Sequence, residues 1–224
     1  MARFYNDARR SKKLPKGFND GIVVILYKKG NRRDVRNYRP ITLLNSDYKI
    51  MTRILAKRML SIVTQFVSDN QIGFVPYTFI AESAMLVKLI QAHLDKIDDG
   101  GILVFCDLEK AFDRCDWNYL NKAIDRLKFT ESHKSWFNLL YNEKQPPSRK
   151  AYVNGKLSRK YSVSVGVAQG CPLSPLTFLV IIESLTRLID NDDRIQGLDL
   201  GGTVLKSRSF ADDTWWFQRS HAEE

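Results

Sequence analysis

The spacing of hydrophobic and polar positions changes along the chain between a period of two and a helical period, which predicts a mixed fold. Apolar runs rich in β-branched and aromatic residues predict strands over 21–26 and 102–107, and a last hairpin over 203–217. Helical spacing predicts helices from a cap at 45–47, over 78–97, 117–127 and 131–143, and from 174 onward. The pattern favours an α+β fold in which an antiparallel sheet packs on helices.

Local signals sharpen three of these elements. Asn154-Gly155 accepts the positive φ angles of a tight turn, so a hairpin is expected there. Ser174 and Pro175 suit the cap and the first turn of the following helix. The helix after residue 47 is expected to bury the face that carries four apolar side chains, Ile50, Ile54, Leu55 and Met59.

Positive charge is concentrated at the start of the chain. Residues 1–60 hold 16 Lys and Arg against 4 Asp and Glu, a net charge of +12, whereas the remainder holds 19 against 21, a net charge of −2. A basic segment joined to a mildly acidic body suits a lobe that grips phosphate beside a metal–carboxylate centre. A solvated basic N-terminus without a special role is the alternative. Residues 1–16 are expected to be irregular.

Cysteine and hydropathy patterns exclude several classes of protein. The 3 cysteines form no CxxC pair and have no histidine partners at zinc-ligand spacing, so neither a disulfide scaffold nor a zinc module is expected. A reducing compartment fits this usage. No run approaches the roughly 18 apolar residues that a membrane span needs, and we expect no membrane partner.

Three aspartates stand in apolar surroundings. Asp107 ends the predicted strand over 102–107, and Asp212-Asp213 lie within the last predicted hairpin. A buried, unpaired carboxylate costs several kcal/mol or shifts its pKa, so a strong positive charge is expected among the three. A pair of Mg²⁺ ions suits them, and this chemistry points to polynucleotide synthesis. The alternative is an exposed Asp-Asp turn and an unrelated aspartate at a strand end.

Five segments, taken in order, resemble the sequence motifs of reverse transcriptases, in the form found in non-LTR (LINE-type) retrotransposons and group II introns. These segments are NYRPITLLN at 37–45, QIGF at 71–74, FCDLEKAFD at 105–113, GVAQGCPLSP at 166–175 and FADD at 210–213. The resemblance covers nearly the whole chain, and the first segment favours the LINE-type branch.

The resemblance implies a right-hand polymerase fold. A basic N-terminal segment over 1–16 would be followed by fingers over 17–100 and by a partial palm over 101–224, with an antiparallel palm sheet packed on helices. Because the sequence stops soon after Asp213, the thumb is expected to be absent. The chain would then be a fragment of a larger retroelement protein, or a decayed copy.

The implied function is that of an RNA-directed DNA polymerase, which adds dNTPs to a primer 3′-OH by two-metal nucleotidyl transfer. Two Mg²⁺ ions, with Mn²⁺ as a possible substitute, would be the cofactors. RNA template, DNA primer, dNTPs and the remainder of a retroelement polyprotein would be the partners. The protein would be intracellular, in nucleus and cytoplasm as a ribonucleoprotein. The alternative is a catalytically silent, basic RNA- or RNP-binding remnant.

The resemblance also assigns roles to single residues. Asp107 and Asp212 would bridge the metals, with Asp213 as a third acidic member. Lys28 and Arg39 would hold the triphosphate, which suits their compact and bidentate donors. A solvated basic turn is the alternative for these two cations.

Three further residues would contact the incoming nucleotide. Phe112 would act as a steric gate against the ribose 2′-hydroxyl, or else would serve only in core packing. Gln169 and Gly170 would lie under the nascent base pair, Gly170 because a side chain there would block close approach.

Overall fold

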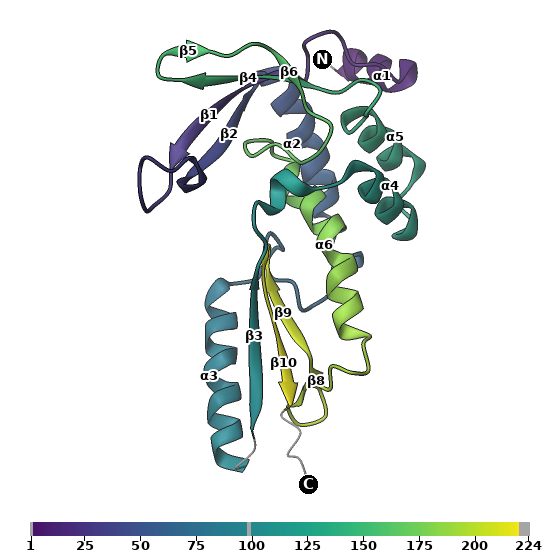
Figure 1. Cartoon of the computed structure of the whole chain (residues 1–224). Coiled ribbons are helices and arrows are strands. Elements are labelled where there is room, and N and C mark those ends of the chain that lie inside the picture. The colour runs from purple at the N-terminus through teal and green to yellow at the C-terminus, as the bar shows by residue number, and fades with distance from the viewer. Residues whose placement is uncertain (1, 98–99, 220–224) are drawn as a thin grey trace. The chain divides into compact units, whose positions relative to one another are not determined.

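The computed structural model describes residues 2–97 and 100–219, which fold as two compact units (Figure 1). The first unit is made of Met1–Met59 and Phe112–Phe178, and the second of Leu60–Ala111 and Leu179–Glu224. Each unit therefore combines two separate stretches of chain. The boundaries expected at 16/17 and 100/101 stay a prediction, and residues 220–224 of the expected palm lie outside the described residues.

A five-stranded sheet organises the first unit. Its strands are β1 (Gly21–Tyr27), β2 (Tyr38–Leu44), β4 (Ser148–Val153), β5 (Lys156–Leu157) and β6 (Tyr161–Ser162). They run in the order β2-β1-β4-β5, with β6 also on β4, and β1 is antiparallel to β2 but parallel to β4. The hairpin expected at Asn154-Gly155 is confirmed, with φ angles of 49° and 77° in the turn between β4 and β5.

Helices complete the first unit. They are α1 (Ala2–Ser11), most of α2 (Ser46–Leu60), α4 (Trp117–Arg126), α5 (Glu131–Leu140) and the start of α6 (Ser174–Asp190), together with 3-10 turns at Val35–Asn37 and Ala111–Arg114. The expectation of an irregular N-terminus was wrong for α1. Tyr5 and Ala8 are buried there, and the Tyr5 hydroxyl donates to Asp47 O at 3.1 Å. Packing against the rest of the unit therefore stabilises a helix that the polar sequence does not predict.

The buried face of α2 differs from the predicted one. Leu55 and Met59 are buried as expected, but Ile50 and Ile54 are 40% and 43% exposed. Tyr48, Met51 and Thr52 are buried in their place. The buried face is rotated toward Tyr48 because an aromatic ring and a threonine, whose hydroxyl donates to Tyr48 O at 2.9 Å, can line a core as well as isoleucine.

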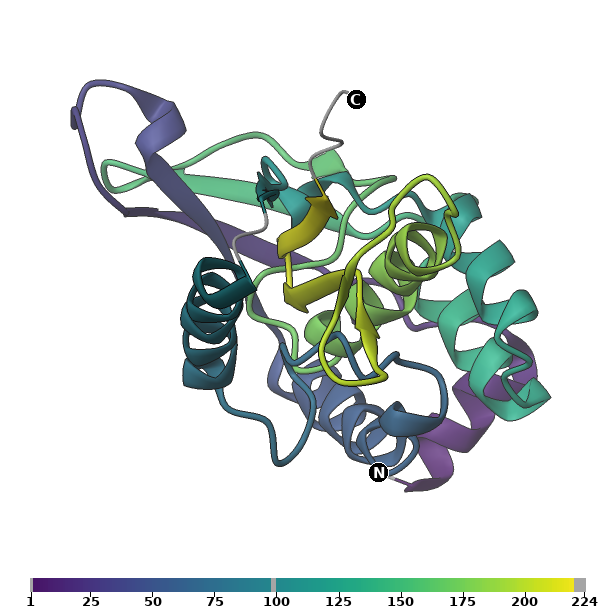
Figure 2. The same ribbon diagram turned by 90° about the horizontal axis from the view of Figure 1, so that it is seen from below.

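The second unit is a three-stranded sheet with helices beside it. Strand β3 (Gly101–Asp107) pairs with β10 (Asp213–Arg219), which pairs with β9 (Ser207–Phe210), all antiparallel. Helix α3 (Ile80–Ile97) lies along the sheet, and Figure 2 shows it nearly end-on beside the strands. Ile90, Trp215 and Phe217 form the buried contact between helix and sheet. The rest of α6 and a 3-10 turn at Val63–Gln65 belong to this unit.

The last hairpin is shorter than the sequence predicts. Val204–Leu205 form β8, which pairs with β7 (Leu198–Asp199) in a small separate sheet, so only residues from 207 onward build the hairpin of β9 and β10. The Asp pair lies at its bend, as predicted. Among the described residues, no helix is long and apolar enough to span a membrane.

Candidate functional site

The second unit brings the three predicted carboxylates together. Asp213, the first residue of β10, is the register partner of Asp107, the last residue of β3. Asp212 lies in the two-residue turn between Phe210 and Asp213, which are paired with each other. Facing residues on antiparallel strands have Cβ atoms about 4.5–5.5 Å apart, so Asp107 and Asp213 are immediate neighbours.

These carboxylates are not buried, which corrects the desolvation argument made from the sequence. Asp107 and Asp213 are exposed and Asp212 is half-buried. They stand at the end of the β3–β10 ladder, and Phe105, two residues before Asp107, is itself 67% exposed, so the apolar run of the sequence does not form a covered core there. The Asp107 and Asp212 carboxylates have no hydrogen-bond or ion-pair partner among the described residues.

The donor set suits a hard divalent cation. Within the described residues, no three His, Cys, Asp or Glu side chains are close enough to hold an ion alone. Mg²⁺ in proteins is commonly held by one or two carboxylates, with water or substrate phosphate completing its shell. Asp107 and Asp213, with Asp212 beside them, fit that arrangement.

A groove leads to the carboxylates within the second unit. It has a volume of about 390 Å³ and lies between α3 and the strands β3 and β10. Its apolar walls include Ile80, Val87 and Trp215, and Asp107 and Asp213 line it as well. The carboxylates are therefore open to a bulky partner rather than sealed in a core.

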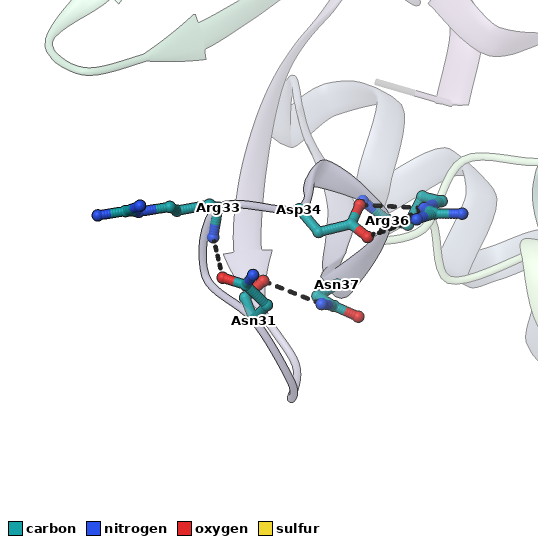
Figure 3. Close-up of polar contacts among 5 residues, drawn as sticks. All are labelled: Asn31, Arg33, Asp34, Arg36 and Asn37. Atoms are coloured by element: carbon teal, nitrogen blue, oxygen red, sulfur yellow. Dashed lines mark hydrogen bonds and ion pairs between the residues drawn. The ribbon is translucent and has the colours of Figure 1, made fainter.

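In the first unit, residues 28–37 form a cationic loop, here called the basic loop, between β1 and β2. Figure 3 shows its polar contacts. Asn31 Oδ1 accepts from Arg33 N at 2.9 Å, and Asn31 O accepts from Asn37 Nδ2 at 2.9 Å. Asp34 pairs with Arg36 at 2.7 Å, and this hydrogen-bonded guanidinium holds the pKa of the Asp34 carboxyl below its usual range.

Two tyrosines brace the basic loop from its base. The Tyr27 hydroxyl donates to Gly30 O at 2.7 Å, and the Tyr38 hydroxyl donates to Arg32 O at 2.8 Å. The Arg32 guanidinium lies 4.8 Å from the centroid of the Tyr27 ring, within cation–π range. The backbone is thus fixed by contacts that leave the cations of the loop at the surface.

The two predicted triphosphate ligands lie on one face of this hairpin. Arg39 is the register partner of Leu26, and Lys28 N donates to Asn37 O at 2.8 Å, which extends the pairing past Tyr27. Alternation then puts Lys28 and Arg39 on the same side as diagonal neighbours. Both are exposed, and neither side chain has a hydrogen-bond or ion-pair partner among the described residues.

Gln169 and Gly170 contact the edge strand β2. Thr42 N donates to Gln169 O at 2.6 Å. Gly170 has a φ of +112°, and a Cβ added to it would lie 2.6 Å from Thr42 O. The structure therefore gives its own reason for glycine at 170, which is the close approach of the Thr42 backbone.

Phe112 lies in the 3-10 turn after β3 and is half-buried. Its ring stacks on Phe178, with centroids 5.2 Å apart and planes at 10°. The packing role considered for Phe112 is thus present in the fold.

Comparison with known proteins identifies the family of the chain. Residues 27–224 match the family described as reverse transcriptase (RNA-dependent DNA polymerase). The chain belongs to the reverse transcriptase family. Its resemblance to the LINE-type branch is confirmed by relatives from retrotransposable elements.

Three curated relatives of this reverse transcriptase chain illustrate the match. The uncharacterized 149 kDa protein of transposon TX1 from Xenopus laevis is 27% identical, over 88% of the chain and 15% of that protein. The Pol polyprotein of retrotransposable element R2DM from Drosophila melanogaster is 25% identical, over 89% and 18%. The RNA-directed DNA polymerase from the mobile element jockey of the same species is 27% identical, over 83% and 20%. The chain spans a fifth or less of these relatives.

Solved structures agree on the fold. Telomerase from Candida tropicalis, in complex with a TWJ fragment of telomeric RNA, has a TM-score of 0.60 at 12% identity, over 99% of this chain and 39% of that one. Telomerase from Candida albicans has a TM-score of 0.57 at 11% identity, over 97% and 42%. At this identity the likeness concerns the polymerase fold alone.

Among the glycines, Gly170 gives a sharp test of the contact with β2 in the reverse transcriptase chain. Gly170→Ala is expected to lower the free energy of unfolding by about 3 kcal/mol, because it adds both a left-handed strain and a collision with Thr42 O. Gly155→Ala is the matched control, since φ is +77° and nothing lies within 4 Å, and should cost about 1 kcal/mol. Urea unfolding measures both, and equal losses would contradict the contact.

Proposed function

We propose that the chain carries RNA-directed DNA polymerase activity, adding dNTPs to a primer 3′-OH on an RNA template by two-metal nucleotidyl transfer. The observation that carries the proposal is the register of β3 and β10, which pairs Asp107 with Asp213 and leaves Asp212 in the adjoining turn. In this assignment the first unit supplies the fingers residues Lys28 and Arg39, and the carboxylates belong to a partial palm.

Asp107 and Asp212 would hold the ions, with Asp213 as third acidic member. Two bound Mg²⁺ ions, or Mn²⁺ in their place, supply activation of the primer 3′-oxygen and stabilisation of the leaving pyrophosphate. The chain's part is to keep negative oxygens facing each other at a strand end, open to water and substrate. The exposure of Asp107 and Asp213 supports this role, because a substrate phosphate must reach the same oxygens.

Lys28 and Arg39 would bind the triphosphate of the incoming nucleotide. They are exposed and lie on one face of the hairpin, so one polyphosphate could contact both. The guanidinium can form two parallel hydrogen bonds to phosphate oxygens and the ammonium adds a compact charge. The further cations of the basic loop would bind backbone phosphates of the RNA template or DNA primer.

Gln169, Gly170 and Phe112 would complete the nucleotide site. The bond from Thr42 N to Gln169 O fixes the backbone of 169–170 against β2, which supports a rigid platform for a base pair. The Phe112 ring would occupy the space that a ribose 2′-hydroxyl needs and so would reject ribonucleotides. As part of a larger retroelement polyprotein, the chain would act inside the cell as a ribonucleoprotein in nucleus and cytoplasm.

Loss of a metal-binding carboxylate should abolish synthesis. Asp107→Asn and Asp212→Asn are each expected to reduce Mg²⁺-dependent primer extension on RNA by about 10³-fold, equivalent to several kcal/mol of transition-state stabilisation. Asp193→Asn, an exposed aspartate of the same unit, should leave extension unchanged. A folded wild-type chain that binds RNA but extends nothing would point instead to the catalytically silent remnant.

The gate role of Phe112 predicts a change in sugar selectivity. Phe112→Ala should raise incorporation of ribonucleotides relative to deoxyribonucleotides by about tenfold or more, because the space of the ring would admit a 2′-hydroxyl. Single-nucleotide insertion kinetics provide the measurement. Phe178→Leu removes the stacking partner and controls for lost packing. If the two variants discriminate between sugars alike, Phe112 serves packing only.

Within the basic loop, the paired and unpaired arginines should contribute differently to RNA binding. The slope of log K against log salt is negative, and Arg33→Met is expected to reduce its magnitude by about 0.7–0.9, since one phosphate contact is lost. Arg36→Met should change the slope less, because Asp34 already neutralises that guanidinium. Fluorescence anisotropy over a salt series measures the slopes, and a larger effect for Arg36 would refute the assignment.

A further inference from the structure

The Gln71 side chain forms hydrogen bonds with the backbone of the turn that leads to Asp212 and Asp213. This side chain is 1% exposed. Its Nε2 donates to Ala211 O at 3.2 Å, and its Oε1 accepts from Ala211 N at 2.8 Å. One buried amide therefore satisfies both backbone polar groups of the residue that precedes Asp212.

Ala211 needs such a partner. Its φ is +57°, a left-handed conformation that costs a residue with a Cβ about 1–2 kcal/mol, and it is 4% exposed. The unmatched N–H and C=O of a buried turn residue would add further cost. The bonds to Gln71 offset both costs and select this turn conformation over alternatives that would point Asp212 elsewhere.

The segment around Gln71 lies directly against the hairpin. Ser209 N donates to Asn70 O at 2.8 Å, and Ile72 N donates to Ser209 O at 2.8 Å, which forms a parallel bridge between 71 and 209. Gly73 N donates to Gln71 Oε1 at 2.7 Å. A Cβ on Gly73 would lie 2.1 Å from Ala211 N, so only glycine permits this approach.

The same segment is tied to α6 within the second unit. Asn70 Nδ2 donates to Asp190 Oδ2 at 3.0 Å, and Ser68 N donates to Glu183 Oε2 at 3.0 Å. Asp190 also accepts from the Ser207 hydroxyl of β9 at 2.8 Å. Gln71 therefore links the turn to a helix rather than to a free loop.

From these contacts we infer that Gln71 is a positioning residue, which sets the conformation of the 210–213 turn so that Asp213 faces Asp107 with Asp212 beside them for divalent-cation binding. The inference rests on the proposed function for its consequence, but not for its geometry. Side chains that orient metal ligands typically change metal affinity by 10–100-fold when they are replaced.

The test compares Gln71→Met with Thr186→Val in the full chain. Gln71→Met keeps the length and loses the amide, whereas Thr186→Val removes a buried hydrogen bond of the same unit that touches neither the turn nor the segment around Gln71. Hydrogen exchange of the Ala211 amide should become at least about tenfold faster in Gln71→Met only. Mn²⁺ binding, followed by the EPR signal of the free ion, should weaken by about 10–100-fold in the same variant.

The outcomes separate the two proposals. If wild type binds Mn²⁺ and Gln71→Met binds it equally well, with unchanged Ala211 exchange, the positioning role is overturned. If wild type binds no Mn²⁺, the proposed metal chemistry fails, and Ala211 exchange alone decides the role of Gln71. Should Gln71→Met not fold, the wild-type chain still tests the positioning role of Gln71. An Ala211 amide that exchanges at the unprotected rate in wild type would contradict that role.

Discussion

The pairing of β3 with β10 is the constraint on which the candidate site depends. Side chains along a strand alternate between faces, so a slip of one residue would exchange them all. Trp215 and Phe217, 6% and 0% exposed, fix the register because both must pack against α3. Asp213 lies two residues before Trp215 and takes the same face at the open end of the ladder, opposite Asp107. The apolar core of the second unit thereby decides which carboxylates meet.

Elements with strong local signals could be predicted from the sequence, and their partners could not. The β-branched run of β1, the Asn154-Gly155 turn and the helical spacing of α3 are each encoded within a few residues, and all three were found. The face of α2 was predicted only in half, because burial of Tyr48 rather than Ile54 depends on what packs against the helix. Helix α1 was missed for the same reason, since Tyr5 and Ala8 are the only side chains of its polar sequence that are buried among those the structure describes.

The candidate site shows the same division between local and distant information. The three aspartates were identified as a group, yet their exposure was not, because apolar neighbours in sequence say nothing of where a strand ends. In the sequence, Gln71 stands out only as the first residue of the QIGF segment at 71–74. Its partner Ala211 is 140 positions away, and no periodicity links an amide to a distant turn. Composition gives no signal either, because Gln71 directly follows three other polar residues, Ser68, Asp69 and Asn70.

Glycine has a shared physical role in the two units. Gly170 lets the 169–170 backbone approach β2, and Gly73 lets the 71–73 backbone approach Ala211. In each case a Cβ would collide with main-chain atoms, which cannot move aside as a side chain can. Backbone-to-backbone contact fixes position more tightly than side-chain packing, because it involves no rotamers. At both places the main chain therefore sets where the residues proposed to touch nucleotide and metal lie.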